Sequence, residues 1–474
     1  MVFQNNVLSG AAGSGTTVHT IDQSIRFNNY YTAYMKRTPS SSGNQRTWTL
    51  SMWVKRSPLG NYGLFGTRTG NTTNFFAVEF NSDDLFVQGY ASSSQTLRFE
   101  TNAHFRDVSA WYNIQLVADT TNVISTERIR IYVNGERITS FASATYPTQN
   151  YDTHINSSSY ENAIGCHNTG SDRVFGGYMT DIVMLDGTAA DPSSFGETNS
   201  SGIWVPKDVS GLTFGTNGFH IDGRDASDLG DDESGQGNDY TTVNLATHDQ
   251  VLDSPTNNFC TLNPNDNRGT PGTLSEGNLK MAFSATNDNV TGTQGISSGK
   301  WYWEAYIVDF NNTYIGVQDS NVSATGYAEK AVALWYGGFI YEDDSDTGDR
   351  AIATSGSAYT NGDVVGVAFD AGNKKIWWSK NGQWYTANAS STSTIAISEV
   401  VAGNSAQVIT RSPDFFMPFY GNYTHSTAIF NFGQEGTFSG NETAGGNSDG
   451  NGVGNFFSAV PSGFLALCTK NLGS

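Results

Sequence analysis

The residues that could do acid–base chemistry are few and scattered. Cleavage of a glycosidic bond uses two carboxylates about 5 to 9 Å apart, one as the acid and the other as base or nucleophile. On a strand, such a pair would appear as acidic residues at alternate positions that face one groove. Glu79 and Glu304 are instead isolated in their segments, and the acidic runs lie in loop-like sequence. The sequence therefore predicts a protein that is not an enzyme.

Zinc and disulfide chemistry also lack their sequence patterns. None of the seven histidines has another histidine at zinc-ligand spacing, and we interpret them as ordinary polar or partly buried side chains. The three cysteines, Cys166, Cys260 and Cys468, are far apart and odd in number, which excludes a disulfide framework and a Cys-x-x-Cys metal pair. We expect them to be small buried hydrophobic residues.

The elements that would position any functional group are strands and turns. The chain has 52 glycines, 13% aromatic residues and only 15% charged residues. Glycine, Asn and Asp suit turns, and aromatic residues fit a pleated surface. Apolar residues alternate along Thr47–Arg56, while Asn134-Gly135 and Asn381-Gly382 each predict a hairpin turn between strands. We therefore predict an all-β fold.

A chain of 474 residues is too long for one core of ordinary size, so we expect at least two domains. Residues 1–23 are interpreted either as a flexible arm or as an attachment arm that orders on a partner. We expect one sandwich over 24–196, a Gly/Asp-rich connector over 197–274 and a second sandwich over 275–474. Gly436–Asn455 is rich in Gly and Asn and predicts a flexible surface loop inside the second sandwich.

The charge balance bears on partners and location. The formal net charge is −20 and the sequence pI is about 4.6, so the mean field repels nucleic acid and we expect no nucleic-acid partner. No stretch approaches the roughly 18 apolar residues of a membrane span, and the first residues lack a basic segment followed by an apolar one. We therefore expect that the chain does not insert into a membrane. We also expect it to fold in the cytoplasm without a signal peptide.

Several motifs of the first half stand in the order of a known family. The motifs are Trp48-Thr49-Leu50-Ser51-Met52-Trp53-Val54-Lys55, Trp111-Tyr112, Ile131-Tyr132-Val133-Asn134-Gly135 and Gly177-Tyr178-Met179-Thr180-Asp181-Ile182. Over about 24–195 the chain resembles laminin-G-like, concanavalin-like domains, which implies a jelly-roll sandwich. Asp232–Asp239 resembles the turn that begins many such repeats. Because some of these domains carry calcium, the resemblance implies Asp231, Asp232 and Asp239 as calcium ligands, with a solvated loop as the alternative.

The second half, about 275–467, resembles a SPRY domain. The motifs that carry the resemblance are Gly299-Lys300-Trp301-Tyr302-Trp303-Glu304, Gly362-Asp363-Val364-Val365-Gly366-Val367-Ala368-Phe369-Asp370, Trp378-Ser379-Lys380-Asn381-Gly382, Pro418-Phe419-Tyr420, Phe430-Asn431-Phe432-Gly433-Gln434 and Pro461-Ser462-Gly463-Phe464. Trp335, Tyr336 and Trp384 fall near SPRY-type loops. Flat apolar rings with a polar rim suit sugars and protein pockets, so we expect these three residues to bind a ligand.

The pair of modules is similar to virion proteins of tailed bacteriophages that infect marine bacteria. This resemblance implies a structural or adhesion component of the virion, such as a fibre, spike or capsid decoration, that folds in the host cytoplasm. Its partners would be other virion proteins and a host surface glycan or receptor, and a symmetric homo-oligomer such as a trimer would be typical of the class. The alternatives are a secreted lectin-like adhesin and a glycan depolymerase.

Overall fold

The computed structural model describes residues 19–68, 73–167, 172–270, 272–322, 330–342, 350–354, 357–387 and 392–472. The chain divides into two compact units with the boundary between Asn257 and Asn258. The described residues up to 257 are the N-terminal unit here, and those from 258 are the C-terminal unit. Residues 1–18 of the predicted arm lie outside the described residues.

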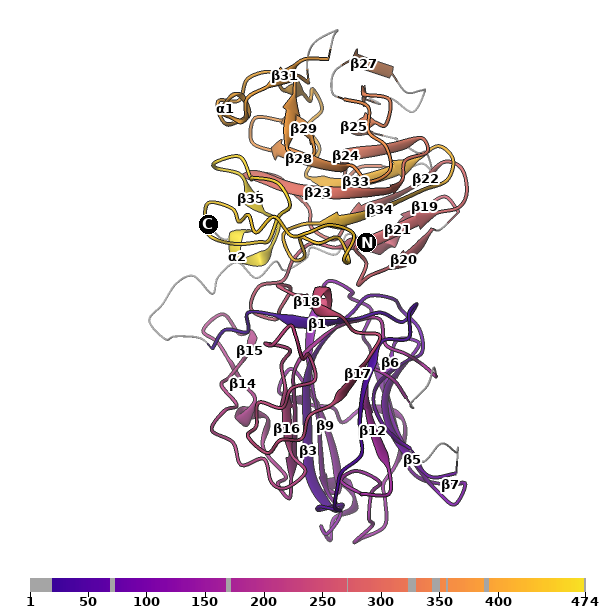
Figure 1. Cartoon of the computed structure of the whole chain (residues 1–474). Helices are drawn as coiled ribbons and strands as arrows, with labels where there is room; N and C mark the ends of the chain where they lie inside the picture. Colours follow the sequence, from indigo (N-terminus) through magenta and orange to yellow (C-terminus); the bar gives the residue numbers. More distant parts are fainter. Residues whose placement is uncertain are drawn as a thin grey trace. The chain divides into compact units, whose positions relative to one another are not determined.

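Two eight-stranded sheets pack face to face in the N-terminal unit, with β3, β9 and β16 in one layer and β5, β7 and β12 in the other (Figure 1). In spatial order, sheet A contains β10 (Glu136–Arg137), β9 (Ile129–Val133), β8 (Trp111–Asp119), β3 (Thr47–Arg56), β13 (Gly177–Asp186), β1 (Ser24–Phe27) and β18 (Gln250–Val251), and β16 (Phe219–Ile221) also pairs with β13. Sheet B contains β11 (Phe141–Thr145), β7 (Ser94–His104), β6 (Asp84–Ala91), β5 (Phe75–Asn81), β4 (Tyr62–Arg68), β12 (Glu161–Ile164), β2 (Tyr34–Arg37) and β17 (Thr241–Val243). A separate pair is formed by β14 (Gly196–Thr198) and β15 (Trp204–Pro206).

Two patterns in the sequence agree with the strands and turns of this unit. Trp48, Leu50 and Met52 lie together in the core between the two sheets, as their alternate spacing predicts. Asn134 and Gly135 both have positive φ, at 49° and 77°, and join β9 to β10 as a type I′ hairpin turn requires. The prediction of an all-β fold is confirmed.

The prediction of a connector over 197–274 is wrong. Residues 197–257 belong to the N-terminal unit, where β16 and β18 extend sheet A and β17 extends sheet B. The same segment supplies Trp204, whose indole Nε1 donates to Asn113 on the outer face of β8. The remainder, from 258, begins the C-terminal unit and includes β19 (Leu262–Arg268). A Gly/Asp-rich composition indicates turns and therefore predicts a linker. It carries no information about contacts with strands that are distant in the sequence.

Buried ion pairs hold residues 197–257, called the added segment below, on sheet A. Lys55 Nζ on β3 lies 2.6 Å from Asp253 Oδ2, and both side chains are almost completely buried. The indole of Trp111 donates to the other oxygen of Asp253 at 3.0 Å. Arg26 on β1 pairs with Asp249 at 3.2 Å, also out of solvent. Buried charges need such partners, so the strands and the segment depend on each other.

The C-terminal unit is also a two-sheet sandwich, with a large core between its sheets. Its seven-stranded sheet C has the order β19, β22 (Asp288–Gly292), β33 (Phe416–Asn422), β24 (Thr313–Asp319), β25 (Ala331–Trp335), β26 (Phe339–Glu342) and β27 (Arg350–Thr354). Its ten-stranded sheet D has the order β20 (Thr273–Ser275), β21 (Lys280–Phe283), β34 (Ser426–Asn431), β23 (Lys300–Asp309), β28 (Val364–Asp370), β29 (Lys375–Lys380), β30 (Gln383–Tyr385) and β31 (Thr394–Ile395), with β32 (Gln407–Val408) on β29 and β35 (Leu465–Ala466) parallel to β23. The helices are α1 (Ile397–Val401) and α2 (Thr469–Leu472).

Gly436–Asn455 is not the loose surface loop that its composition predicts. Phe438 from this stretch is buried in the core of the C-terminal unit. Asp449 accepts hydrogen bonds from the backbone N–H groups of Asn451, Val453 and Ala466, and from the Asn471 amide. Such contacts fix the stretch against the sandwich, and its glycines serve tight turns within it.

Replacement of Asp253 by Asn tests whether the added segment is integral to the N-terminal unit. The change removes the carboxylate that compensates Lys55 in a dry environment, so we expect a loss of about 3 to 5 kcal/mol in the free energy of unfolding of this unit. Urea unfolding followed by tryptophan fluorescence measures the loss. Asp152→Asn, at the exposed ion pair with Arg46, is the matched control and should leave the transition in place. An unchanged transition in Asp253→Asn would contradict this role of the ion pair.

Candidate functional site

An aromatic cluster surrounds the hairpin between β25 and β26 in the C-terminal unit. Trp335 ends β25, and its ring centroid lies 4.4 Å from that of Tyr336, 5.7 Å from that of Phe339 and 6.0 Å from that of Tyr341. The cluster is completed by two rings from the preceding part of the chain, Phe310 against Tyr336 at 5.5 Å and Tyr314 against Tyr341 at 5.4 Å. Five of these rings are partly exposed, and Tyr314 is buried.

The backbone holds this hairpin in one shape. Gly338 donates its N–H to the Trp335 carbonyl across the turn, and Tyr336 donates to the Thr313 carbonyl on β24. A Cβ atom on Gly337 would come within 2.3 Å of the Trp335 ring, so glycine at this position lets the indole lie over the turn. The aromatic cluster is therefore preorganised, and its partly exposed rings can contact a ligand with little further ordering.

The three predicted binding residues do not share one environment. Trp335 and Tyr336 lie side by side in the aromatic cluster, while Trp384 lies on β30 and is only 2% exposed. Its ring packs toward Tyr302, with the centroids 6.2 Å apart. The prediction that Trp384 offers a ring to a ligand is wrong, because the indole is buried beside Tyr302, which packs in turn against Phe456.

The structure does not bring Asp231, Asp232 and Asp239 together as a metal site. Both carboxylate oxygens of Asp232 are used by protein donors, namely the backbone N–H groups of His220, Ser234 and Asn238 and the Ser234 hydroxyl. Asp239 accepts the N–H of Asp232 itself. The Asp232 carboxylate organises a turn, and the calcium role of the three aspartates stays a prediction. Burial and the nearby carboxylates of Asp239, Asp228 and Asp225 raise the pKa of Asp231.

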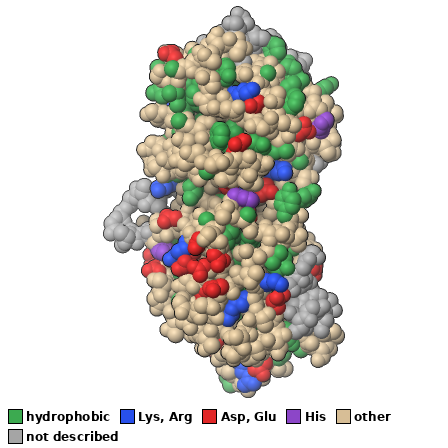
Figure 2. Space-filling view, in the orientation of Figure 1, with side chains coloured by type: hydrophobic (Ala, Val, Ile, Leu, Met, Phe, Trp, Pro, Cys, Tyr) green, Lys and Arg blue, Asp and Glu red, His purple; other side chains and the backbone are tan. Residues whose placement is uncertain are grey.

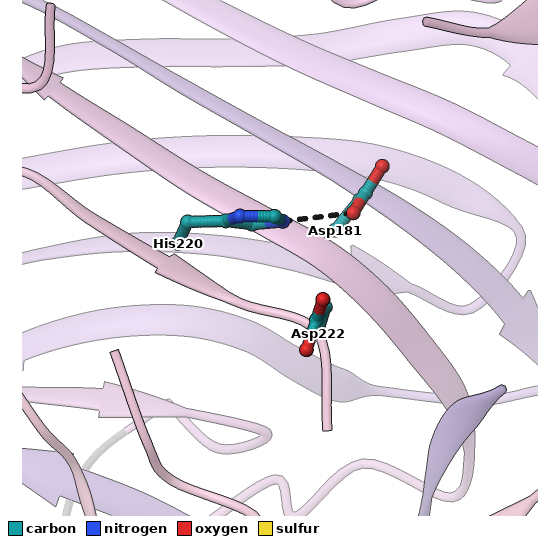
Figure 3. A group of neighbouring side chains, drawn as sticks. All are labelled: Asp181, His220 and Asp222. Carbon is teal, nitrogen blue, oxygen red and sulfur yellow. Dashed lines mark hydrogen bonds and ion pairs between the residues drawn. The ribbon is translucent and has the colours of Figure 1, made fainter. Parts of the chain in front are cut away.

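A different group of polar side chains does converge, on the outer face of sheet A. Asp181 on β13, His220 on β16 and Asp222 just after β16 are all buried, and one potential ligand atom from each lies within 4.8 Å of the others (Figure 3). We call these three residues the Asp–His–Asp triad. The Asp181 backbone has a positive φ of 46° where β13 shifts register against β3, which turns its side chain to the outer face.

Charge pairing fixes the imidazole of the triad. His220 Nε2 lies 2.8 Å from Asp181 Oδ1. Burial lowers the pKa of His220, but the hydrogen bond and charge of Asp181, together with the charge of Asp222, outweigh burial and leave the pKa raised. Asp222 also accepts a hydrogen bond from the guanidinium of Arg224 at 2.6 Å. Arg224 forms a second ion pair with Glu233. Sequence reasoning missed the triad because about forty residues separate its two parts, although His220 and Asp222 stand at the spacing that places both on one face of a strand.

The two isolated glutamates are buried and fully engaged. On β5, Glu79 accepts from Gln88 Nε2 at 2.7 Å and pairs with Arg173 at 2.6 Å and with His167 Nδ1 at 2.9 Å. On β23, Glu304 accepts from the Tyr302 hydroxyl and from the backbone N–H groups of Phe457 and Ser458. In this arrangement both carboxylates act as internal hydrogen-bond acceptors.

Part of the N-terminal unit matches a known family model. Residues 29–190 match a family model described as the concanavalin A-like lectin/glucanases superfamily. The match lies within the sandwich predicted from 24 to 196 and supports the concanavalin-like resemblance. No curated protein sequence matches the chain.

Solved structures similar to this chain include a SPRY domain and two further proteins. The SPRY domain of human HERC1 is 17% identical and aligns over 36% of this chain and 96% of its own, with a TM-score of 0.26. A heptameric SAP-like pentraxin from Limulus polyphemus is 16% identical over 37% of this chain and 80% of its own, with a TM-score of 0.28. A putative carbohydrate binding protein from Bacteroides ovatus is 16% identical over 48% of this chain and 60% of its own, with a TM-score of 0.29.

Within the described residues, no helix is both long enough and apolar enough to cross a membrane.

The Glu79 network should make the N-terminal unit sensitive to acid. Burial raises the pKa of Glu79, but His167 and Arg173 outweigh burial and leave the pKa below its usual value. A lowered folded-state pKa contributes stability that is present above the unfolded-state pKa and is lost as pH falls through the folded-state pKa. We expect Glu79→Gln to lower the free energy of unfolding by about 3 kcal/mol at pH 7. The difference in this free energy between the variant and the unsubstituted chain should become smaller as the pH falls below about 4.5.

Urea midpoints between pH 3 and pH 7 measure this gap. Glu100→Gln, at the more exposed ion pair with Arg98, serves as the control for loss of one carboxylate from the same sheet. A gap that stays constant over the whole range would show that the charge of Glu79 is not the source of the effect.

Proposed function

We propose that this chain is a non-catalytic binding protein whose C-terminal unit contacts a carbohydrate through the aromatic cluster around Trp335. The observation that carries the proposal is the meeting of six aromatic rings, five of them partly exposed, at one hydrogen-bonded hairpin. Aromatic side chains give large contact area at a small cost in conformational entropy, and tyrosine adds a hydroxyl that can donate to or accept from a ligand.

The charge of the chain narrows the class of carbohydrate. With a net charge of −20, the protein repels a polyanionic glycan at long range. Figure 2 shows one face of the molecule, on which most atoms belong to uncharged polar side chains or the backbone, with apolar, acidic and basic side chains between them. A neutral polysaccharide can bind among uncharged groups without desolvating charges. The proposed ligand is therefore a neutral glycan.

Binding is favoured over hydrolysis by the state of the carboxylates. A glycosidase needs two carboxyl groups that reach the scissile bond. The carboxylates of Glu79 and Glu304 are buried and already accept several internal hydrogen bonds. The lectin-type superfamily matched by residues 29–190 supports the same choice, although that superfamily also includes glucanases.

We further propose that the protein works on the surface of a tailed-phage virion, where it joins other virion proteins as a symmetric homo-oligomer. The support for this location is the resemblance of the paired modules to virion proteins. Mass spectrometry and cryo-electron microscopy of purified particles should show ordered copies of the chain. Their absence from particles would overturn the virion proposal and leave the carbohydrate proposal standing.

Binding to neutral polysaccharides should depend on the aromatic cluster. We expect Trp335→Ala and Tyr336→Ala each to weaken binding at least tenfold, or about 1.4 kcal/mol, because each removes a ring from the contact surface. Isothermal titration against β-glucans and galactans, chosen from a glycan array, measures the change.

Val408→Ala is the matched control, because Val408 is an exposed apolar side chain on β32 in the same unit. Circular dichroism checks that each variant is folded. Full-strength binding by both aromatic variants would exclude the cluster as the site.

The same polysaccharides should remain uncleaved. A reducing-end assay over several hours at pH 5 and pH 7 is expected to match the buffer blank, because neither buried glutamate is free to transfer a proton to a substrate. Release of reducing ends that is lost in Glu79→Gln but kept in Glu100→Gln would favour the depolymerase alternative.

A further inference from the structure

The Asp–His–Asp triad has the composition of a metal site. One imidazole nitrogen and two carboxylates, each from a different position on sheet A, converge in a region where all three side chains are buried. Imidazole suits zinc and neighbouring transition metals, while carboxylate oxygens complete mixed sites of this kind. We propose that Asp181, His220 and Asp222 bind one divalent transition-metal ion, with zinc as the representative ion.

The charge around the triad supports a cation there. The ion pairs join three carboxylates, on Asp181, Asp222 and Glu233, to one guanidinium and one imidazole. One negative charge is therefore in excess even when His220 is protonated. A divalent ion bound to neutral imidazole balances this set, and burial increases the benefit of such neutralisation.

The three ligand atoms lie within 4.8 Å of one another, so the side chains must draw together around an ion. Zinc lies about 2.0 to 2.1 Å from nitrogen and about 2.0 to 2.2 Å from oxygen, so two ligand atoms of a tetrahedral site lie about 3.3 Å apart. His220 Nε2 and Asp181 Oδ1 are 2.8 Å apart, so the pair must open by about half an ångström as the ion takes the place of the shared proton. Within the triad Arg224 contacts only Asp222, and its other ion pair is with Glu233. Its side chain is more than half exposed, so a movement of Arg224 would open the Asp222 side of the triad to an incoming ion.

Metal binding would fasten the two parts of the N-terminal unit together. Asp181 belongs to β13 in the middle of sheet A, whereas His220 and Asp222 belong to the segment after residue 197. The N–H of His220 also bonds to Asp232, so the ion would be connected to the turn that Asp232 organises. Because the ion binds the folded state, it should raise the thermal midpoint of this unit.

Metal titration of the full chain tests the proposal. After treatment with a chelator and dialysis, isothermal titration with zinc chloride should show one site per chain that is lost in His220→Gln and in Asp181→Asn. His104→Gln removes a histidine from an exposed pair with Asp84 in the same unit and should keep the site. Equal stoichiometry in the unsubstituted chain, His220→Gln and His104→Gln would assign the binding to surface groups and overturn the proposal.

A spectroscopic readout keeps the test independent of variant folding. Cobalt(II) added to the unsubstituted, metal-free chain should give visible absorption of a four- or five-coordinate ion with nitrogen and oxygen ligands, and zinc should abolish it. Absorption of the aquo ion alone, or binding of calcium with no binding of zinc, would overturn the assignment. Neither result depends on carbohydrate binding, so this proposal and the proposed function fail separately.

Discussion

Charged side chains on the outer faces of the sheets decide where the irregular parts of both units lie. In the N-terminal unit, Lys55 points away from the core and meets Asp253 in a dry ion pair. In the C-terminal unit, Glu304 points away from the core and accepts the N–H groups of Phe457 and Ser458. A charge or carboxylate removed from water without these partners would cost several kcal/mol. Each of these two outer faces therefore requires a particular piece of distant chain, which becomes part of the fold.

This dependence explains what could be read from the sequence and what could not. Strand alternation and Asn-Gly turns are local signals, and Thr47–Arg56, Asn134-Gly135 and Asn381-Gly382 have the predicted structures. The stretches 197–257 and 436–455 have the composition of linkers, yet partners hundreds of residues away or on other strands hold them. Composition reports the turns in such a segment and contains no information about long-range hydrogen bonds.

The functional groups divide in the same way. Trp335 ends β25, Tyr336 follows it and two glycines come next, so aromatic rings near a turn could be predicted, and both residues lie in the aromatic cluster. Trp384 follows an Asn-Gly turn and looks alike in sequence, but it is buried beside Tyr302, against which Phe456 from a distant part of the chain also packs. The Asp–His–Asp triad depends on a register shift in β13, and a register shift is a property of strand pairing that no short motif records.

The parallel strand β35 has a consequence for how the protein is made. Leu465 and Ala466 lie beside Trp301 and Tyr302, although more than 160 residues separate them along the chain. The N-terminal unit has all its strands once residue 257 has been synthesised, so it can fold while the ribosome is still translating. In the C-terminal unit, β23 lacks its parallel neighbour β35 until the ribosome has synthesised residues 465 and 466. The contact between β23 and β35 closes a long loop of chain, which is a slow step in folding. Translation thus separates the two folding events in time, which lowers the chance that strands of one sandwich pair with those of the other.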